Sequence, residues 1–100
     1  MITNEEVATR LEDSPFPRVT REGIQDKIHS VRYFNDDTLT IAVLTLFNDF
    51  KVVGSAACVD PGNYDEAIGQ RLAFEDGVRQ IWALEGYVLR SRIFERESQA

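Results

Sequence analysis

Residues 39–47 read Leu-Thr-Ile-Ala-Val-Leu-Thr-Leu-Phe, and this stretch decides the fold. Apolar side chains occupy both alternating sets of positions: Leu39, Ile41, Val43 and Phe47 on one side, and Ala42, Leu44 and Leu46 on the other. A strand that is apolar on both faces is typical of the central position in a sheet. The sequence therefore predicts a central strand whose second face is covered by the rest of the fold or by another subunit.

Segments with high β-propensity flank this strand on both sides. Residues 31–34 precede it across the polar Asn35-Asp36-Asp37, and residues 50–59 follow it across Asn48-Asp49. Short polar turns of this kind join neighbouring antiparallel strands. We therefore expect a three-stranded antiparallel meander over residues 31–59.

A long helix is expected after the sheet, because no proline interrupts the chain from Tyr64 to about Glu95. Asn63, with Glu66 three residues later, is expected to cap its N-terminus. Glycine inside a helix costs about 1 kcal/mol relative to alanine. Gly86 should therefore have a packing reason, or bend or divide the helix. The residues at helical spacing that should cover the sheet are Ala67, Phe74, Val78, Ile81 and Val88.

Residues 1–18 are expected to hold a short helix and a proline-containing linker. Thr3 followed by Glu6 is a capping box, which predicts a helix over residues 4–12. Prolines on both sides of Phe16 end that helix, and this ring should pin the linker to the core.

A second short helix is expected before the sheet. Val19, Thr20 and Ile24 form a hydrophobic staple around an N-cap, which predicts a helix over about residues 21–30. The complete pattern predicts one α+β domain: two short N-terminal helices, a three-stranded antiparallel meander and a long C-terminal helix packed on the sheet. Residues 96–100 form a polar tail.

Composition narrows the possible functions. Seventeen acidic residues against eleven basic ones give a net charge of −6, which weighs against general nucleic-acid binding. The single cysteine allows no intramolecular disulfide and favours a reducing compartment. No apolar run approaches the roughly 20 residues that span a bilayer, and the first residues do not resemble a secretion signal. We expect a soluble intracellular protein without a membrane partner.

Several segments together resemble a known family. They are residues 19–28, 38–46 and 50–60, Asn63-Tyr64-Asp65, Gly69, Ala73 and residues 82–89, which read Trp-Ala-Leu-Glu-Gly-Tyr-Val-Leu. The chain is similar over roughly residues 19–92 to a small phage protein family named for gene product 49 of an N4-type podovirus and gene product 66 of a Shigella phage. The chain departs from the family pattern at Asn48-Asp49, where the family usually reads Asn-Gly.

The resemblance implies a phage or prophage accessory protein that acts in the cytoplasm of the infected bacterium. It makes residues 19–95 the family core, and it assigns no catalytic residue. The residues themselves indicate no enzyme either: Cys58 ends an apolar strand and is expected to be a buried structural thiol, and His29 has no companion at metal-ligand spacing. The phosphate-binding loop motifs are absent, so we predict no catalytic site, no metal and no cofactor.

Arginines and aromatic residues share the long helix. Arginine beside a stacking surface suits a ligand that carries phosphates and a base. Arg71 and Arg79 are favoured because they flank Glu75 on nearly the same helical side. The alternative is that the rings belong to the core and the arginines pair with neighbouring acids. The candidate ligand-binding residues are Arg71, Arg79, Trp82, Tyr87 and Arg90.

Gly69, Ala73 and Gly77 form a row of small residues at intervals of four. Such a row lets another backbone approach closely. It lies either over a crowded strand of the same chain or at a helix-to-helix contact between subunits. Together with the doubly apolar strand, this row predicts a homo-oligomer and makes these residues candidates for its interface.

Two functions from different classes remain. The first is a non-enzymatic inhibitor that binds a bacterial host protein or defence component. The second is an oligomeric sponge that sequesters a nucleotide second messenger. A panel of cyclic nucleotides in a thermal-shift assay would separate them, because a ligand at one hundred times its Kd adds about 2.7 kcal/mol of stability.

Overall fold

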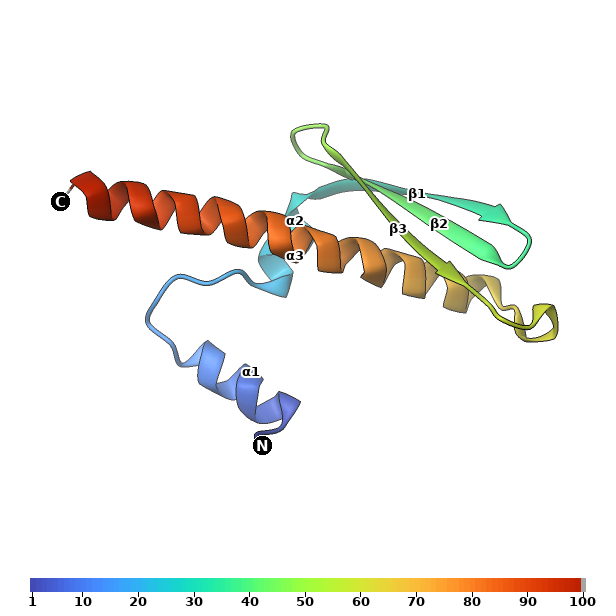
Figure 1. Cartoon of the computed structure of the whole chain (residues 1–100), viewed down its shortest axis with the longest axis horizontal. Coiled ribbons are helices and arrows are strands. Elements are labelled where there is room, and N and C mark those ends of the chain that lie inside the picture. Colours follow the sequence, from blue (N-terminus) through green and yellow to red (C-terminus); the bar gives the residue numbers. More distant parts are fainter. Residues whose placement is uncertain (100) are drawn as a thin grey trace.

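A single long helix lies across one face of a three-stranded sheet in the computed structural model, which describes residues 1–99 (Figure 1). The sheet covers the first half of this helix, and the second half projects beyond it. The elements in chain order are α1 (Asn4–Glu12), α2 (Arg21–Lys27), β1 (Ile28–Asp36), β2 (Leu39–Leu46), β3 (Lys51–Ala57), the 3-10 turn η1 (Pro61–Asn63) and α3 (Glu66–Gln99).

The predicted meander is confirmed. The strands run in the order β1-β2-β3, and both neighbouring pairs are antiparallel, so β2 is central. Each hairpin turn holds one aspartate with positive φ, Asp37 at 56° and Asp49 at 68°. Aspartate tolerates this left-handed conformation better than most residues. The backbone N–H of Phe50 also donates to Asn48 Oδ1 at 3.1 Å, so Asn48-Asp49 forms the second turn without a glycine.

The second helix is shorter than expected. Thr20 caps α2 as predicted, accepting a hydrogen bond from the Gly23 N–H at 3.0 Å. However, α2 ends at Lys27 rather than near residue 30, because the Lys27 carbonyl accepts from the N–H of Phe47 at 2.9 Å and the chain turns into the sheet. Residues 28–30 therefore begin β1, and His29 is an exposed strand residue although it falls within the helix predicted over residues 21–30.

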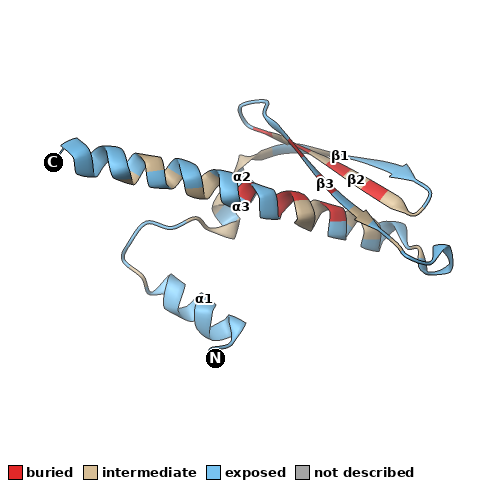
Figure 2. Ribbon diagram, in the orientation of Figure 1, coloured by how far each residue is buried: buried red, intermediate tan, exposed pale blue. Residues whose placement is uncertain are grey.

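Of the two alternatives for the second face of β2, the structure excludes coverage by the rest of the chain, and coverage by another subunit stays a prediction. The buried side chains alternate: Thr40, Ala42, Leu44 and Leu46 face α3. Leu39, Ile41 and Val43 point the other way and are only half-buried, and Phe47 beyond the strand is exposed. Figure 2 shows buried residues in the sheet and the adjoining part of α3, and Ile24 of α2 is buried as well. The second face of the sheet is open.

The core is a single cluster between the sheet, α2 and α3. Its α3 contribution comes from a short stretch, residues 73–81. Val78 and Ile81 are buried there as expected, and Phe74 is half-buried, whereas Ala67 and Val88 are exposed because they lie to either side of this stretch. The buried apolar residues are Ile24, Ala42, Leu44, Leu46, Val52, Ala73, Val78 and Ile81.

The small-residue row of α3 lies on the chain's own sheet. A Cβ added to Gly77 would meet Leu44 Cδ1 at 2.8 Å, and one added to Gly69 would meet Thr40 Oγ1 at 2.5 Å. Between them, Ala73 is fully buried. The first of the two interpretations therefore describes the chain, and an interface between subunits must be sought on other residues.

The expectations about the N-cap of the long helix and about Gly86 in its interior both need correction. Asp65, not Asn63, caps α3, because its Oδ1 accepts from the N–H groups of Ala67 at 2.9 Å and Ile68 at 3.2 Å. Asn63 belongs to η1 instead. At Gly86, α3 continues without interruption, and apart from the backbone of its own helical turns and its two neighbours, no heavy atom lies within 4 Å of the position of an added Cβ. Within the single chain Gly86 has no packing reason.

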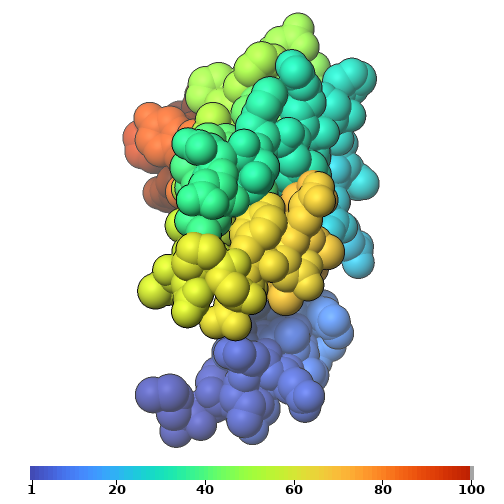
Figure 3. All heavy atoms as spheres, turned by 90° about the vertical axis from the view of Figure 1, so that its right-hand side faces the viewer, coloured from blue at the N-terminus to red at the C-terminus, as the bar shows by residue number. Residues whose placement is uncertain are grey.

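The N-terminal segment stands apart from the body. α1 covers residues 4–12 as predicted, and Thr3 caps it through the Glu6 N–H at 3.1 Å. α1 has no buried residue, and Phe16 is 75% exposed, so the expectation that this ring pins the linker to the core is wrong. In Figures 1 and 3 this segment, in blue, protrudes on the side of α3 away from the sheet.

Candidate functional site

The five candidate ligand-binding residues are spread around α3 rather than gathered. Trp82 and Tyr87 are five residues apart, which turns their side chains about 140° from each other around the helix axis. Arg71 and Arg79 have 68% and 69% of their side-chain surface exposed, and Arg90 is also exposed. These side chains are therefore exposed to solvent at separate places on α3. Within one chain they do not surround a common site for a base and its phosphates.

Glu75 is the centre of a charge cluster that joins α2 to α3. Arg21 holds its carboxylate with two hydrogen bonds, Nη1 to Oε2 at 2.9 Å and Nη2 to Oε1 at 2.6 Å. Arg71 adds a contact at 2.9 Å, as the sequence suggested. The hydrogen bonds from Arg21 lower the pKa of Glu75 below its usual value, and the same bonds raise the pKa of Arg21. Arg21 was missed because 54 residues separate it from Glu75.

Asp76, not Glu75, is the partner of Arg79, with Nη2 at 3.1 Å from Oδ1. Its other oxygen accepts the backbone N–H of Ser55 on β3 at 2.9 Å, and this bond is the main cause of its lowered pKa. One turn later, Gln80 donates to the Val53 carbonyl at 2.7 Å. These two side chains cover the free edge of β3, which would otherwise offer unpaired backbone groups to another strand. The role of Asp76 and Gln80 is structural.

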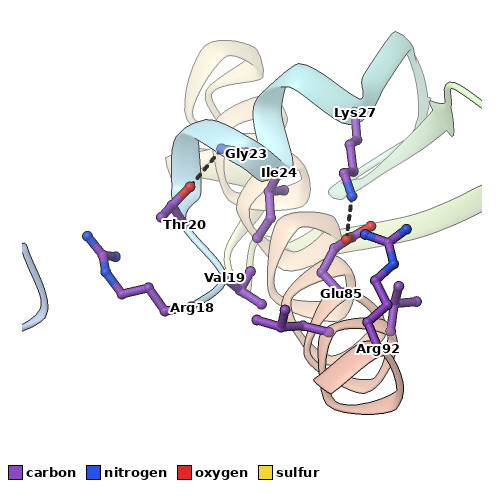
Figure 4. Close-up of a pocket in the computed structure, with 10 residues that line it drawn as sticks. Arg18, Val19, Thr20, Gly23, Ile24, Lys27, Glu85 and Arg92 are labelled. Atoms are coloured by element: carbon purple, nitrogen blue, oxygen red, sulfur yellow. Dashed lines mark hydrogen bonds and ion pairs between the residues drawn. The ribbon is translucent and has the colours of Figure 1, made fainter. Parts of the chain in front are cut away.

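A shallow hollow lies where α2 meets the second half of α3 (Figure 4). Lys27 Nζ binds Glu85 Oε2 at 2.6 Å across it. In Figure 4 the Arg92 side chain points toward this ion pair, whereas Arg18 points away from it. Its volume of about 160 Å³ is below the roughly 300–1,000 Å³ of small-molecule sites. The hollow does not fit a nucleotide.

A larger hollow, which we call the hairpin groove, lies between the β2–β3 hairpin and the second half of α3. Its volume is about 360 Å³, and its lining is mostly apolar. Tyr87 and Phe50 stand on opposite sides of it, 77% and 54% exposed. Leu84, three residues before Tyr87 on α3, also lines it and is 42% exposed. The hairpin groove is lined by Leu46, Asn48, Phe50, Ala83, Leu84, Glu85, Tyr87 and Val88.

The sequence pattern that defines the Phage protein (N4 Gp49/phage Sf6 gene 66) family matches residues 19–93. The chain belongs to this family. No curated protein and no solved structure matches it. The family segment contains α2, the whole sheet and most of α3, and therefore both sides of the hairpin groove. The separate α1 segment lies outside it.

In this phage protein Cys58 and His29 lie at opposite ends of the sheet. The residue before His29 pairs with Leu46, and the residue before Cys58 pairs with Leu39. The length of β2 therefore separates them by roughly 20 Å at about 3.3 Å per residue. Cys58 is half-buried rather than fully buried, and its thiol donates to the Asp60 carbonyl at 3.1 Å. These two residues do not form a nucleophile and base pair.

Residues 1–99 of the phage protein contain neither a metal cluster nor a membrane-spanning helix. No group of three or more His, Cys, Asp or Glu side chains in this part of the chain is arranged to hold a metal ion. Within the same range, the helices are too short or too polar to cross a membrane. The site best formed by this family segment is thus an apolar surface, the hairpin groove.

Proposed function

We propose that this phage protein is a non-enzymatic accessory protein that acts in the cytoplasm of the infected bacterium. It binds a host or defence protein through the hairpin groove and inhibits it. The observation that supports this proposal is the exposed aromatic pair Tyr87 and Phe50, which borders an apolar hollow inside the family segment.

Physical reasons favour a protein partner for this groove. Apolar side chains on the surface of a chain are common, but a contiguous apolar hollow bordered by exposed aromatics is typical of an interaction site. Tyrosine contributes disproportionately to binding energy when it is desolvated at the centre of an interface. Asn48 and Glu85 at the margin supply polar groups around the apolar centre. Such a surface suits an apolar side chain or helix of another protein.

Site-specific photo-crosslinking tests this proposal. A photoreactive amino acid is placed at Tyr87, and in a matched control at Phe16, which is 75% exposed but lies outside the family segment. In infected bacteria we expect a discrete covalent adduct with a bacterial protein at position 87 and none at position 16. Unlabelled wild-type protein should compete for this adduct, whereas the Tyr87→Ala variant should not.

The opposite results are equally clear. Equal labelling at both positions would mean non-specific contact. An adduct of twice the chain mass alone would mean that the groove binds another copy of this protein. Either result would overturn the proposed role of the hairpin groove.

A second candidate function, an oligomeric sponge for a phosphate-bearing nucleotide signal, is favoured by the charges around Glu75. Arg21, Arg71 and Arg79 face only Glu75 and Asp76 in this cluster, which leaves an excess of one positive charge. Bringing such clusters together in an oligomer would concentrate positive charge despite the net charge of −6.

The sponge is tested with a panel of cyclic nucleotides and a thermal-shift readout. A true ligand at one hundred times its Kd should add about 2.7 kcal/mol of stability. Changing Arg71 and Arg79 to alanine should abolish that shift and leave the melting temperature of the free protein nearly unchanged. Binding that survives the double change would remove this candidate's residue-level support.

A further inference from the structure

The open face of the sheet is an ordered apolar surface. Three rows of paired residues cross it from β1 through β2 to β3. Its apolar centre is not covered by α1, which lies beyond α3 on the other side of the molecule (Figure 1). Phe34 is 47% exposed and Val53 is 52% exposed. The rows are Arg32–Val43–Val53, Phe34–Ile41–Ser55 and Asp36–Leu39–Ala57.

The charges on this face have opposite signs at opposite ends. Arg32 lies one row before Phe34 on β1, and Asp36 lies one row after it. The Arg32 guanidinium covers the Phe34 ring, 5.1 Å from its centroid. Within residues 1–99 neither Arg32 nor Asp36 forms an ion pair. Arg32 and Asp36 are thus a free positive and a free negative group, equally spaced about Phe34. A second free positive group, Lys51, lies on β3 one row beyond Val53, where its Nζ donates to Thr45 Oγ1 at 3.4 Å.

We propose that this face binds the same face of a second copy of the chain, with the strands of the two sheets antiparallel. A two-fold axis that crosses the strands at the level of Phe34 sets Arg32 opposite the partner's Asp36, and Asp36 opposite the partner's Arg32. The same axis sets Val43 over the partner's Leu39. Arg32 and Asp36 both gain ion-pair partners, and the apolar centre leaves water.

The alternative two-fold axis, parallel to the strands, does not match the charges. It lays β1 of one copy over β3 of the other at the same level. Arg32 would then face the partner's Val53, and Asp36 would face the partner's Ala57. The charge pattern therefore selects the antiparallel arrangement, and aligned packing of two twisted sheets at about 30° accommodates it.

Charge reversal gives a test that does not depend on a single variant. Arg32→Glu puts two like-charged contacts in the homodimer, and so does Asp36→Arg. Each variant alone should lose at least about tenfold in dimer affinity, because like charges face each other twice. When the two variants are mixed, every contact is complementary again, so a heterodimer should form.

Sedimentation velocity at micromolar concentration reads the outcome. The wild-type chain should sediment at twice its 11.4 kDa mass, each variant near the monomer mass, and the equimolar mixture again at the dimer mass. Arg10→Glu on α1 is the matched control, with the same change in net charge away from the face, and should remain dimeric. A wild-type monomer, dimeric single variants or a mixture that stays monomeric would each overturn the proposal.

Discussion

Gly54 and Gly86 show two opposite situations for a glycine in this protein. A Cβ added to Gly54 would lie 2.1 Å from the Ala73 carbonyl oxygen and 2.4 Å from the Gly77 nitrogen, both backbone atoms of α3. An added Cβ at Gly86 would meet no heavy atom within 4 Å beyond its own helical turns. Gly54 therefore determines how closely the sheet and α3 approach each other. Gly86 is not required by any close contact within one chain.

Gly54→Ala and Gly86→Ala should change stability in opposite directions. The first forces the backbone of α3 away from β3, and overpacking of this kind costs about 1–3 kcal/mol or more. The second removes the helix penalty of glycine and should add about 0.5–1 kcal/mol to the free energy of unfolding. Urea denaturation of both variants measures these changes. A destabilising Gly86→Ala would show that a backbone from another molecule packs at this site.

Trp82 and Ile81 are neighbours on α3 with different burial, which makes them a matched pair. Ile81 is fully buried in the core, so Ile81→Ala should cost about 2–5 kcal/mol. Trp82 is 38% exposed and lies outside the core cluster, so Trp82→Ala should cost about 1 kcal/mol. Thermal or urea denaturation reads both values. A loss near 4 kcal/mol at Trp82 would mean that its ring is buried in the protein as it exists in solution.

At the scale of elements, α2 is fixed to α3 by Ile24 and by the Arg21–Glu75 pair. Ile24 is fully buried, and Arg21 binds both oxygens of the Glu75 carboxylate. Because the pKa of Glu75 is lowered from its usual 4.5 in the folded state, the unfolded chain binds this proton more readily. The stability from the pair is therefore complete above about pH 4.5 and is lost as pH falls through the lowered pKa.

Glu75→Gln should remove this acid dependence. At pH 7 the variant should lose about 1 kcal/mol, the upper end of the range for solvent-accessible pairs. Below pH 4.5 the wild-type and variant melting temperatures should converge, because protonated Glu75 no longer pairs with Arg21. Melting temperatures from pH 3 to pH 7 measure this, with Glu97→Gln on the exposed end of α3 as control. Parallel curves for Glu75→Gln and wild type would contradict the stabilising role of the pair.

Elements with local signals could be predicted, and contacts between distant residues could not. Thr3 and Thr20 cap their helices through residues three positions away, so the sequence shows both caps. The end of α2 depends on a hydrogen bond from Phe47, twenty residues later, and no local pattern reveals it. Before α3, Asn63 and Asp65 both belong to residue types that favour N-caps. Asn63 is part of the 3-10 turn η1, and Asp65 caps the helix.

The candidate site was predicted less well than the fold for the same reason. The sequence places Arg71 near Glu75 because they share one helix, but it cannot place Arg21 there. Tyr87 was a candidate through its helix, whereas Phe50, across the hairpin groove, lies 37 positions earlier and was read only as a strand residue. Tertiary packing alone brings the end of the β2–β3 hairpin next to the turn of α3 that carries Tyr87.

At the scale of the whole molecule, the described chain is extended and thin. Its principal extents are 58 × 37 × 18 Å, and its radius of gyration of 16.9 Å exceeds the roughly 13 Å of a compact 100-residue domain. Two features account for this shape: α1 lies apart from the body, and the second half of α3 extends past the sheet (Figure 1). Neither feature contributes an apolar residue to the buried core cluster.

Deleting residues 1–16 should therefore leave the fold intact. α1 buries no residue, and the deleted segment precedes the family match at residue 19. The free energy of unfolding should change by less than about 0.5 kcal/mol, as for surface changes away from structural features. Urea denaturation compares the two chains. A large loss of stability would show that α1 packs on this chain or on another copy in solution.

The sheet covers only the first half of α3. The two halves of this continuous helix should therefore differ in their rates of amide hydrogen exchange. Its backbone hydrogen bonds are unbroken from Glu66 to Gln99, yet its buried residues all lie between positions 73 and 81. Amide hydrogen exchange should be slow in that segment, where only global unfolding opens it, and fast beyond Gly86, where the helix can fray locally. A protein in the hairpin groove would slow exchange in the fast half of α3, whereas a second copy on the open face would protect β1 and β3.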